Sequence, residues 1–228
     1  MRRRWLTLLT VALLVGSVAA FSYTERLKLQ RSPVGVARFD RWLSPECDCP
    51  QATVSLSFLL RKPERIEVAV VDPDDNEVRR LATDARRPAG RIEFEWDGRN
   101  EEGAVVPDGP YRVRVRLLNE RRTIVVPVDV RLDTKPPRVR DVDVSPTTVA
   151  AGEEVEIRLT TNEFGTPVVF VDGEAAERGP PGRPGERRLT WETLVPGTYE
   201  VAVAVEDRAG NLSEPAGPTT VLVAGALR

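Results

Sequence analysis

Short runs in which hydrophobic and polar residues alternate cover most of the chain after residue 34. Placing the hydrophobic residues at every second position gives a β-strand one apolar face and one solvated face. Turn signals such as Asp97-Gly98 and Asp108-Gly109 separate the runs, because glycine tolerates positive φ and aspartate can bond its own backbone. Pro127 favours a sheet edge for its run, since proline cannot donate to the ladder. In the first half of the chain, this pattern predicts strands within 35–43, 53–60, 65–71, 77–81, 92–96, 111–115 and 123–132.

The series begins again after the sequence DTKPP at 133–137, which we interpret as a short linker that its two prolines make semi-rigid. Six further runs have apolar residues at every second position. They are Val142 and Val144; Val155, Ile157 and Leu159; Val169 and Val171; Leu189 and Trp191; Tyr199, Val201, Val203 and Val205; and Val221 and Val223.

The two halves share an order of features. Each has a tryptophan strand, a proline-containing loop and a Gly-x-Tyr sequence that opens a valine-rich strand, at Trp96 and Tyr111 in the first half and at Trp191 and Tyr199 in the second. The repeat of roughly 90 residues suits tandem sandwich domains. We therefore predict an all-β fold of two tandem Ig-like or fibronectin-like β-sandwiches, at 35–132 and 138–228. We expect these four aromatic residues to mark the two cores.

The first 34 residues differ from the rest. A basic stretch at 1–4 precedes an apolar run at 5–23, and a charged spacer follows at 24–34. As a helix, its apolar part from Trp5 to about Phe21 is about 25 Å long at about 1.5 Å per residue, slightly short of a bilayer core of about 30 Å. We favour an uncleaved signal anchor over a signal peptide, although small residues at Val18 and Ala20 suit cleavage. The first interpretation gives a single-pass membrane protein that contacts the membrane through this helix, and the second a secreted protein. Both place the domains outside the cytoplasm.

The amino-acid composition limits which reactions and ligands are expected of the chain. The chain has no histidine, which removes the commonest general base and the commonest neutral metal ligand at pH 7. Lysines are three of the 33 basic residues, and the net charge of -2 gives no electrostatic reason to expect nucleic acid as a partner. We expect no catalytic residues, no cofactor and no metal. The sequence Asp72, Asp74, Asn76 has the opening spacing of a calcium loop, but Glu77 stands where its glycine should be, so we favour a solvated turn.

Cys47 and Cys49 are the two cysteines of the chain. In an oxidising compartment they could form a disulfide that pins a tight turn, which we favour; redox activity, an intermolecular disulfide and a metal site are the alternatives. Trp42 lies outside the clear strand patterns and is the candidate for an exposed aromatic binding residue.

Two stretches resemble a known family. WDGRNEEGAVVPDGPYRVRV, beginning at Trp96, closely resembles the end of the Ig-like domain first described in the bacterial flagellar hook-capping protein. VAVVDPDDNEVRRLA at 68–82 resembles the central hairpin of that domain, and SPECDC at 44–49 has cysteines where many such modules have glycine. In the second half, DTKPP and VEDRAGNLSEP are similar to generic bacterial Ig-like surface modules. The resemblance implies an Ig-like fold and no flagellar role, because fold does not determine function.

From these features we expect a non-enzymatic, membrane-tethered protein with a structural or adhesive role at the bacterial cell envelope, with another envelope protein or a cell-wall glycan as its partner. The alternative is a cell-wall or carbohydrate-binding module that uses Trp42 or the loops around Asn100 and Arg183.

Overall fold

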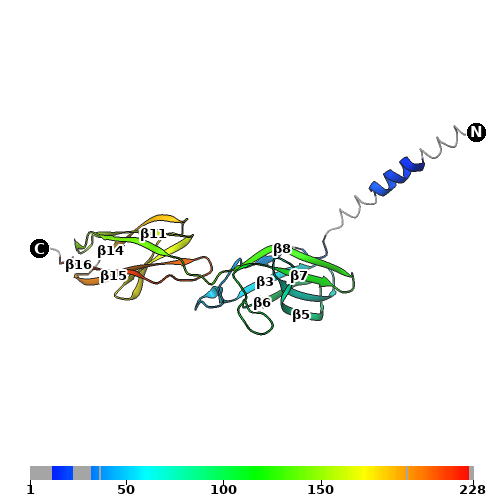
Figure 1. Cartoon of the computed structure of the whole chain (residues 1–228), viewed down its shortest axis with the longest axis horizontal. Coiled ribbons are helices and arrows are strands. Elements are labelled where there is room, and N and C mark those ends of the chain that lie inside the picture. Colours follow the sequence, from blue (N-terminus) through cyan, green and yellow to red (C-terminus); the bar gives the residue numbers. More distant parts are fainter. Residues whose placement is uncertain (1–11, 23–31, 36, 194, 226–228) are drawn as a thin grey trace, which may run out of the picture.

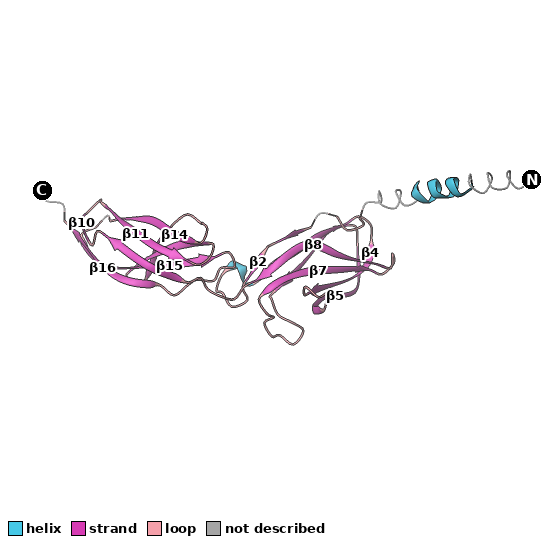
Figure 2. Cartoon of the chain, turned by 45° about the horizontal axis from the view of Figure 1, so that its top comes forward, coloured by secondary structure: helices cyan, strands magenta, loops and turns pink. Residues whose placement is uncertain are grey.

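The computed structural model describes residues 12–22, 32–35, 37–193 and 195–225, and it contains two β-sandwich domains that follow one another along the long axis of the molecule (Figures 1 and 2). This confirms the predicted all-β fold of tandem Ig-like or fibronectin-like sandwiches. The first domain contains β1 (Arg38–Phe39), β2 (Trp42–Leu43), the short 3-10 helix η1 (Pro50–Ala52), β3 (Val54–Leu60), β4 (Glu64–Val71), β5 (Glu77–Arg87), β6 (Gly90–Trp96), β7 (Gly109–Leu117) and β8 (Arg122–Leu132). The second domain contains β9 (Val139–Ser145), β10 (Thr148–Ala150), β11 (Glu154–Thr161), β12 (Gly165–Val171), β13 (Glu174–Arg178), β14 (Gly185–Glu192), β15 (Gly197–Asp207) and β16 (Ala216–Ala224).

The first sandwich packs a sheet of order β1-β3-β6 against a sheet of order β2-β8-β7-β4-β5. Alternation along β3 and β7 turns Leu56, Phe58, Val113 and Val115 inward, where each is almost fully buried. Trp96 on β6 is 2% exposed, and its ring meets that of Tyr111 edge to face at 5.1 Å between centroids. Such a pair contributes about 0.5–1.5 kcal/mol beyond the stabilisation that comes from burying the two rings.

The second sandwich packs a sheet of order β14-β11-β9 against one of order β10-β16-β15-β12-β13. Its core is made mainly of valines, including Val201, Val203 and Val205 on β15. Trp191 and Tyr199 repeat the edge-to-face contact at 5.6 Å, but here both rings are only partly buried and lie against the margin of the core. Among the described residues, the members of both cores lie within residues 34–223.

The first predicted strand, 35–43, is divided by the structure. β1 pairs antiparallel with β3 in one sheet, whereas β2 pairs parallel with the end of β8 in the other. Trp42 therefore lies in a two-residue strand of its own, although the sequence around it shows no clear alternation. On one side of β8, β2 pairs only with the last two residues, so Pro127 lies where β8 forms the edge of the sheet, as predicted. On the other side, the pairing of β8 with β7 shifts register between Arg112 and Arg114.

At the N-terminal side, residues 12–22 form a helix. Among the described residues, no helix is both long and apolar enough to cross a membrane. The predicted apolar segment at 5–23 and the spacer at 24–34 lie partly outside the described residues.

Candidate functional site at the junction of the two domains

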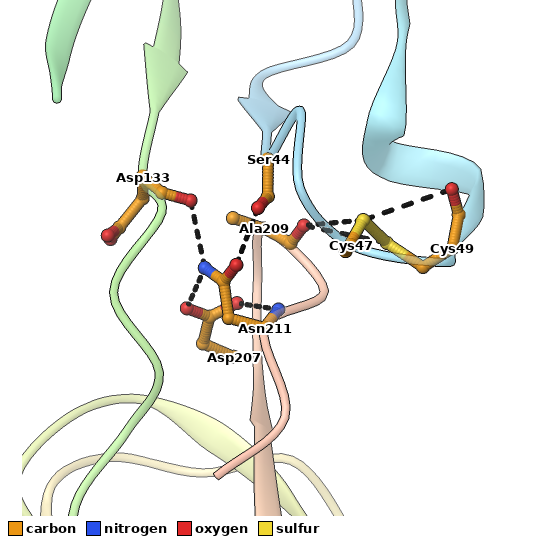
Figure 3. The surroundings of a disulfide bond; sticks show 7 residues. All are labelled: Ser44, Cys47, Cys49, Asp133, Asp207, Ala209 and Asn211. Atoms are coloured by element: carbon orange, nitrogen blue, oxygen red, sulfur yellow. Dashed lines mark hydrogen bonds between the residues drawn. A yellow bond between two sulfur atoms is a disulfide. The ribbon is translucent and has the colours of Figure 1, made fainter. Parts of the chain in front are cut away.

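A loop from the first domain meets a turn from the second at the junction. The loop runs from Ser44 to η1 and is held by its own backbone, since Ser44 N–H donates to Gln51 O at 3.0 Å and Cys47 N–H to Ser44 O at 3.3 Å. Cys47 and Cys49 form a disulfide within this loop (Figure 3). Because only one residue separates the two cysteines, the cross-link restricts the loop itself and does not join distant strands.

The partner of this loop is the turn Asp207–Asn211 after β15. Asp207 Oδ1 accepts the backbone N–H of Asn211 at 2.9 Å, and Asp207 Oδ2 accepts its side-chain amide at 2.8 Å. The first domain contains the same arrangement after β4, where Asp72 accepts the backbone and side-chain N–H groups of Asn76, each at 2.9 Å. Asn76 is exposed, whereas Asn211 is buried in the junction. Two turns with the same hydrogen bonds thus differ in whether another domain contacts them.

Asn211 connects the two domains through both ends of its side-chain amide (Figure 3). Its Oδ1 accepts the hydroxyl proton of Ser44 at 2.5 Å, and its Nδ2 donates to the backbone oxygen of Asp133 at 2.8 Å. Ser44 is fully buried and Asn211 is 7% exposed. Buried polar groups of this kind are costly to leave unpaired, so the hydrogen bonds favour one arrangement of the two domains.

The disulfide packs against the same turn. The sulfurs of Cys47 and Cys49 lie 3.9 and 3.8 Å from the backbone oxygen of Ala209. These are van der Waals contacts, because a disulfide sulfur carries no hydrogen to donate. Gly210 has a φ of +88°, and a Cβ atom built on it would lie 2.3 Å from the sulfur of Cys49. Only glycine meets both the backbone conformation and the close approach of the disulfide.

The linker is fastened to both domains. On the first-domain side, Thr134 donates its backbone N–H and its hydroxyl to Asp108, and Lys135 forms an ion pair with the same carboxylate at 2.9 Å. Partial burial acts to raise the pKa of Asp108, but the hydrogen bonds from Lys135 and Thr134 outweigh it and hold this pKa below its usual value. On the other side, Arg138 N–H donates to Asn162 Oδ1 at 2.6 Å. The linker is thus an ordered strap between the domains.

Trp42 lies at the side of the junction and is partly buried. The guanidinium of Arg208 is 5.5 Å from the centre of the Trp42 ring and 3.8 Å from that of Phe164, and the guanidinium of Arg131 is 5.9 Å from Trp42. Arg208 is a second-domain cation between one aromatic ring from each domain. Such contacts favour association modestly, by about 0.5–1 kcal/mol at exposed sites.

Three carboxylates gather beside these rings. One oxygen each from Asp133, Glu163 and Asp207 lies within 4.8 Å of the others. Burial raises the pKa of Glu163, and the charges of Asp207 and Asp133 raise it further. Burial likewise raises the pKa of Asp207, against the hydrogen bonds from Asn211. Carboxylate oxygens are ligands for hard cations, but two guanidinium groups, from Arg131 and Arg208, line the same small cavity and supply counter-charge.

The structure brings some of the sequence candidates together and leaves others apart. Cys47, Cys49 and Trp42 all lie at the junction, whereas Trp96, Tyr111, Trp191 and Tyr199 pack in or against the two cores. The sequence alone did not point to Ser44, Asn211 or the carboxylate cluster as parts of a site, because the residues that meet there come from distant parts of the chain. One signal was present: the second turn, DRAGN, repeats the Asp-x-x-x-Asn spacing of DPDDN in the first domain.

The chain is thus a tandem of Ig-like β-sandwich domains with an ordered junction. Residues 50–120 match the sequence profile of the FlgD Ig-like domain, which confirms the family resemblance for that part of the chain. No curated protein matches the chain significantly in sequence.

Solved structures with similar folds come from several sources. The fibronectin(III)-like modules of Clostridium thermocellum CbhA match with 19% identity and a TM-score of 0.47, over 84% of this chain and 95% of that one. The human OSCAR ligand-binding domain matches with 18% identity and a TM-score of 0.35, over 83% and 96% of the two chains. The Yersinia pseudotuberculosis adhesin InvE matches with 10% identity and a TM-score of 0.32, over 82% and 58%. The fold assignment rests on the strands and sheets of this chain itself.

Proposed function

We propose that the chain is a non-enzymatic, membrane-tethered protein with a structural or adhesive role at the bacterial cell envelope, and that its two Ig-like domains face away from the cytoplasm. The observation that carries the proposal is the junction, where Asn211 bonds both to Ser44 and to the backbone of Asp133. A tandem that transmits force or presents a surface at a set distance needs its domains held at one angle. Flexible tethering alone would need only a linker.

The disulfide supports the proposed location. Disulfides form and persist in oxidising compartments outside the cytoplasm, whereas cytosolic thiols are kept reduced. In the junction, the oxidised pair of Cys47 and Cys49 packs against Ala209 of the other domain. The assembled form of the junction is therefore the form expected outside the cytoplasm.

The contacts of Trp42 argue against the glycan-binding alternative. A sugar stacks on an aromatic ring whose face is open, but Trp42 is partly buried and has two guanidinium groups within 6 Å of its ring centre. Asn100, in the other candidate loop, uses its side-chain oxygen to accept the backbone N–H groups of Glu102 and Ala104. Both residues support the fold of their own surroundings.

The location is tested with the full chain produced in bacterial cells. We expect the protein in the membrane fraction, cleaved by a protease added outside the cytoplasmic membrane, with no maleimide-reactive thiol before reduction and two after it. Protease protection together with two reactive thiols in the untreated protein would contradict the proposal. For the partner, chemical cross-linking on intact cells should capture a protein. Saturable binding to purified peptidoglycan that Trp42→Ala abolishes would instead favour the glycan-binding alternative.

A further inference from the structure

The end of the first domain farthest from the junction gathers three turns: β3 to β4, β5 to β6, and β7 to β8. The strand registers bring them together, since Glu64 lies opposite Arg87, Leu60 opposite Gly90, and Leu117 opposite both Ile66 and Arg122. In Figure 2 this is the end at β4, and the junction with its short helix η1 lies at the other end of the domain.

Positive charge is concentrated at this end. We call the following six residues the basic end, and none of them forms an ion pair within the part of the chain that the structure describes: Arg61, Lys62, Arg86, Arg87, Arg121 and Arg122. All but Arg87 are exposed. Long cationic side chains without acidic partners are free to meet an external anion.

The acidic residues nearby do not cancel this charge. Glu64 is buried and accepts the backbone N–H groups of Arg65 and Asn119, each at 2.9 Å, so it fixes the turns in place from beneath. Asp84 is paired with Arg65, an additional cation outside the six. Glu120 is the exposed acid that remains among the described residues of the three turns. The basic end therefore has a clear excess of positive charge.

The rest of the molecule has an excess of negative charge. Residues 35–132 contain 17 basic and 18 acidic residues, so the excess at one end of the first domain implies a deficit at the other. Residues 133–228 contain 10 basic and 16 acidic residues. Charge thus changes from positive to negative along the long axis that Figure 1 displays. Such a distribution orients a molecule in an external field.

The chain enters the first domain at the basic end. Arg61 donates its backbone N–H to Pro33 O at 3.0 Å and its Nε to Ser32 O at 2.9 Å, and Val34 pairs with Leu60. The residues that lead from the apolar N-terminal run are therefore bound directly to the cationic turns.

We propose that the basic end docks on anionic lipid headgroups of the membrane to which the N-terminal segment leads, and that it holds the two domains upright on that surface. The six cations attract the headgroups within a Debye length of about 8 Å at physiological salt, and the acidic second domain is repelled from them. The inference rests on the proposed membrane tether for the source of the surface. A lipid surface is favoured over a soluble polyanion because the charges lie where the apolar segment joins the domain.

The test uses residues 32–228, which contain all the described strands and both cores, so that the apolar segment cannot bind vesicles by itself. Sedimentation is measured with vesicles of phosphatidylcholine alone and with vesicles that also contain phosphatidylglycerol. We expect binding to the anionic vesicles, with added salt weakening it. Each cation removed near an anionic surface should weaken binding about fivefold. The triple variant Lys62→Gln, Arg86→Gln, Arg122→Gln should therefore bind at least 50-fold more weakly, by order of magnitude.

A matched control removes the same charge elsewhere. The exposed residues Arg138, Arg140 and Arg183 of the second domain also form no ion pair among the described residues, and their triple replacement by glutamine should leave vesicle binding unchanged or only slightly weaker. Equal loss in both triple variants, or equal binding to neutral and anionic vesicles, would overturn the proposal. Binding to soluble polyphosphate without binding to anionic vesicles would overturn it in favour of a soluble polyanion. Loss of the membrane tether in cell fractionation would contradict the proposed function and leave this vesicle result standing.

Discussion

Replacing Asn211 and Ser44 by alanine, singly and together, should show that the two domains are energetically coupled. Each single variant removes the 2.5 Å hydrogen bond across the junction and leaves one partner unpaired, Ser44 being fully buried. A net hydrogen bond contributes about 0.5–1.5 kcal/mol, and an unpaired buried group costs about 1–3 kcal/mol. The double variant removes both partners of this hydrogen bond, so it avoids the cost of leaving a buried polar group unpaired. We expect it to be destabilised by about 1–3 kcal/mol less than the sum of the single variants.

The assay is equilibrium urea unfolding of residues 32–228, followed by tryptophan fluorescence, with the free energies of both domains summed if they unfold separately. Asn76→Ala provides the control, because Asn76 makes the same contacts to its turn aspartate but lies on the surface of the first domain. Asn76→Ala combined with Ser44→Ala should be additive. If the Asn211 and Ser44 variants also add to within about 0.5 kcal/mol, the junction does not couple the domains.

Three further changes test other parts of the structure. Gly210→Ala should destabilise the junction more than Gly173→Ala in urea unfolding: both glycines have positive φ, but only the first would place its Cβ against the disulfide, so equal losses would refute the steric argument. Glu163→Gln should raise the melting temperature at pH 7, and the gain should vanish as the pH falls below about 4. The pKa of Glu163 is higher in the folded state than in the unfolded state, so the folded protein binds the proton more tightly. The protein therefore loses stability as the pH rises from the unfolded-state pKa to the folded-state pKa. A gain in melting temperature that does not depend on pH would show that the charge of Glu163 is not its cause. Trp96→Ala should cost about 3–5 kcal/mol in unfolding free energy and Trp191→Ala clearly less, because only the first indole is almost fully buried; a larger loss at Trp191 would contradict the packing of the second core.

The strands were largely predictable because alternation is a local property of the sequence. β3, β4 and β7 bury the apolar side chains at alternate positions, β6 and β15 bury or half-bury theirs, and this alternation is written in the sequence. β13 was missed for a related reason: all five of its residues are exposed, so the sequence EAAER has no apolar face to recognise. The division of 35–43 between two sheets also leaves no local signal, since the chain changes partners while it stays extended.

The junction could not be predicted in the same way. The bond between Ser44 and Asn211 joins residues separated by 167 positions, and it depends on how two finished domains meet. The sequence supplied the two cysteines and a turn with the Asp-x-x-x-Asn spacing. It did not supply the contact between them, because period-two patterns describe faces of sheets and carry no information on the ends of sandwiches.

We infer that the junction holds the two Ig-like domains at one angle. Residual dipolar couplings of backbone amides, measured separately for residues 37–132 and 138–225 in one weakly aligned sample, test it most directly. The structure predicts that both domains fit a single alignment tensor of the same magnitude and orientation, and that reduction of the disulfide between Cys47 and Cys49 makes the two tensors diverge. Tensors of different magnitude in the oxidised protein would show that the domains move independently, and would contradict the claim.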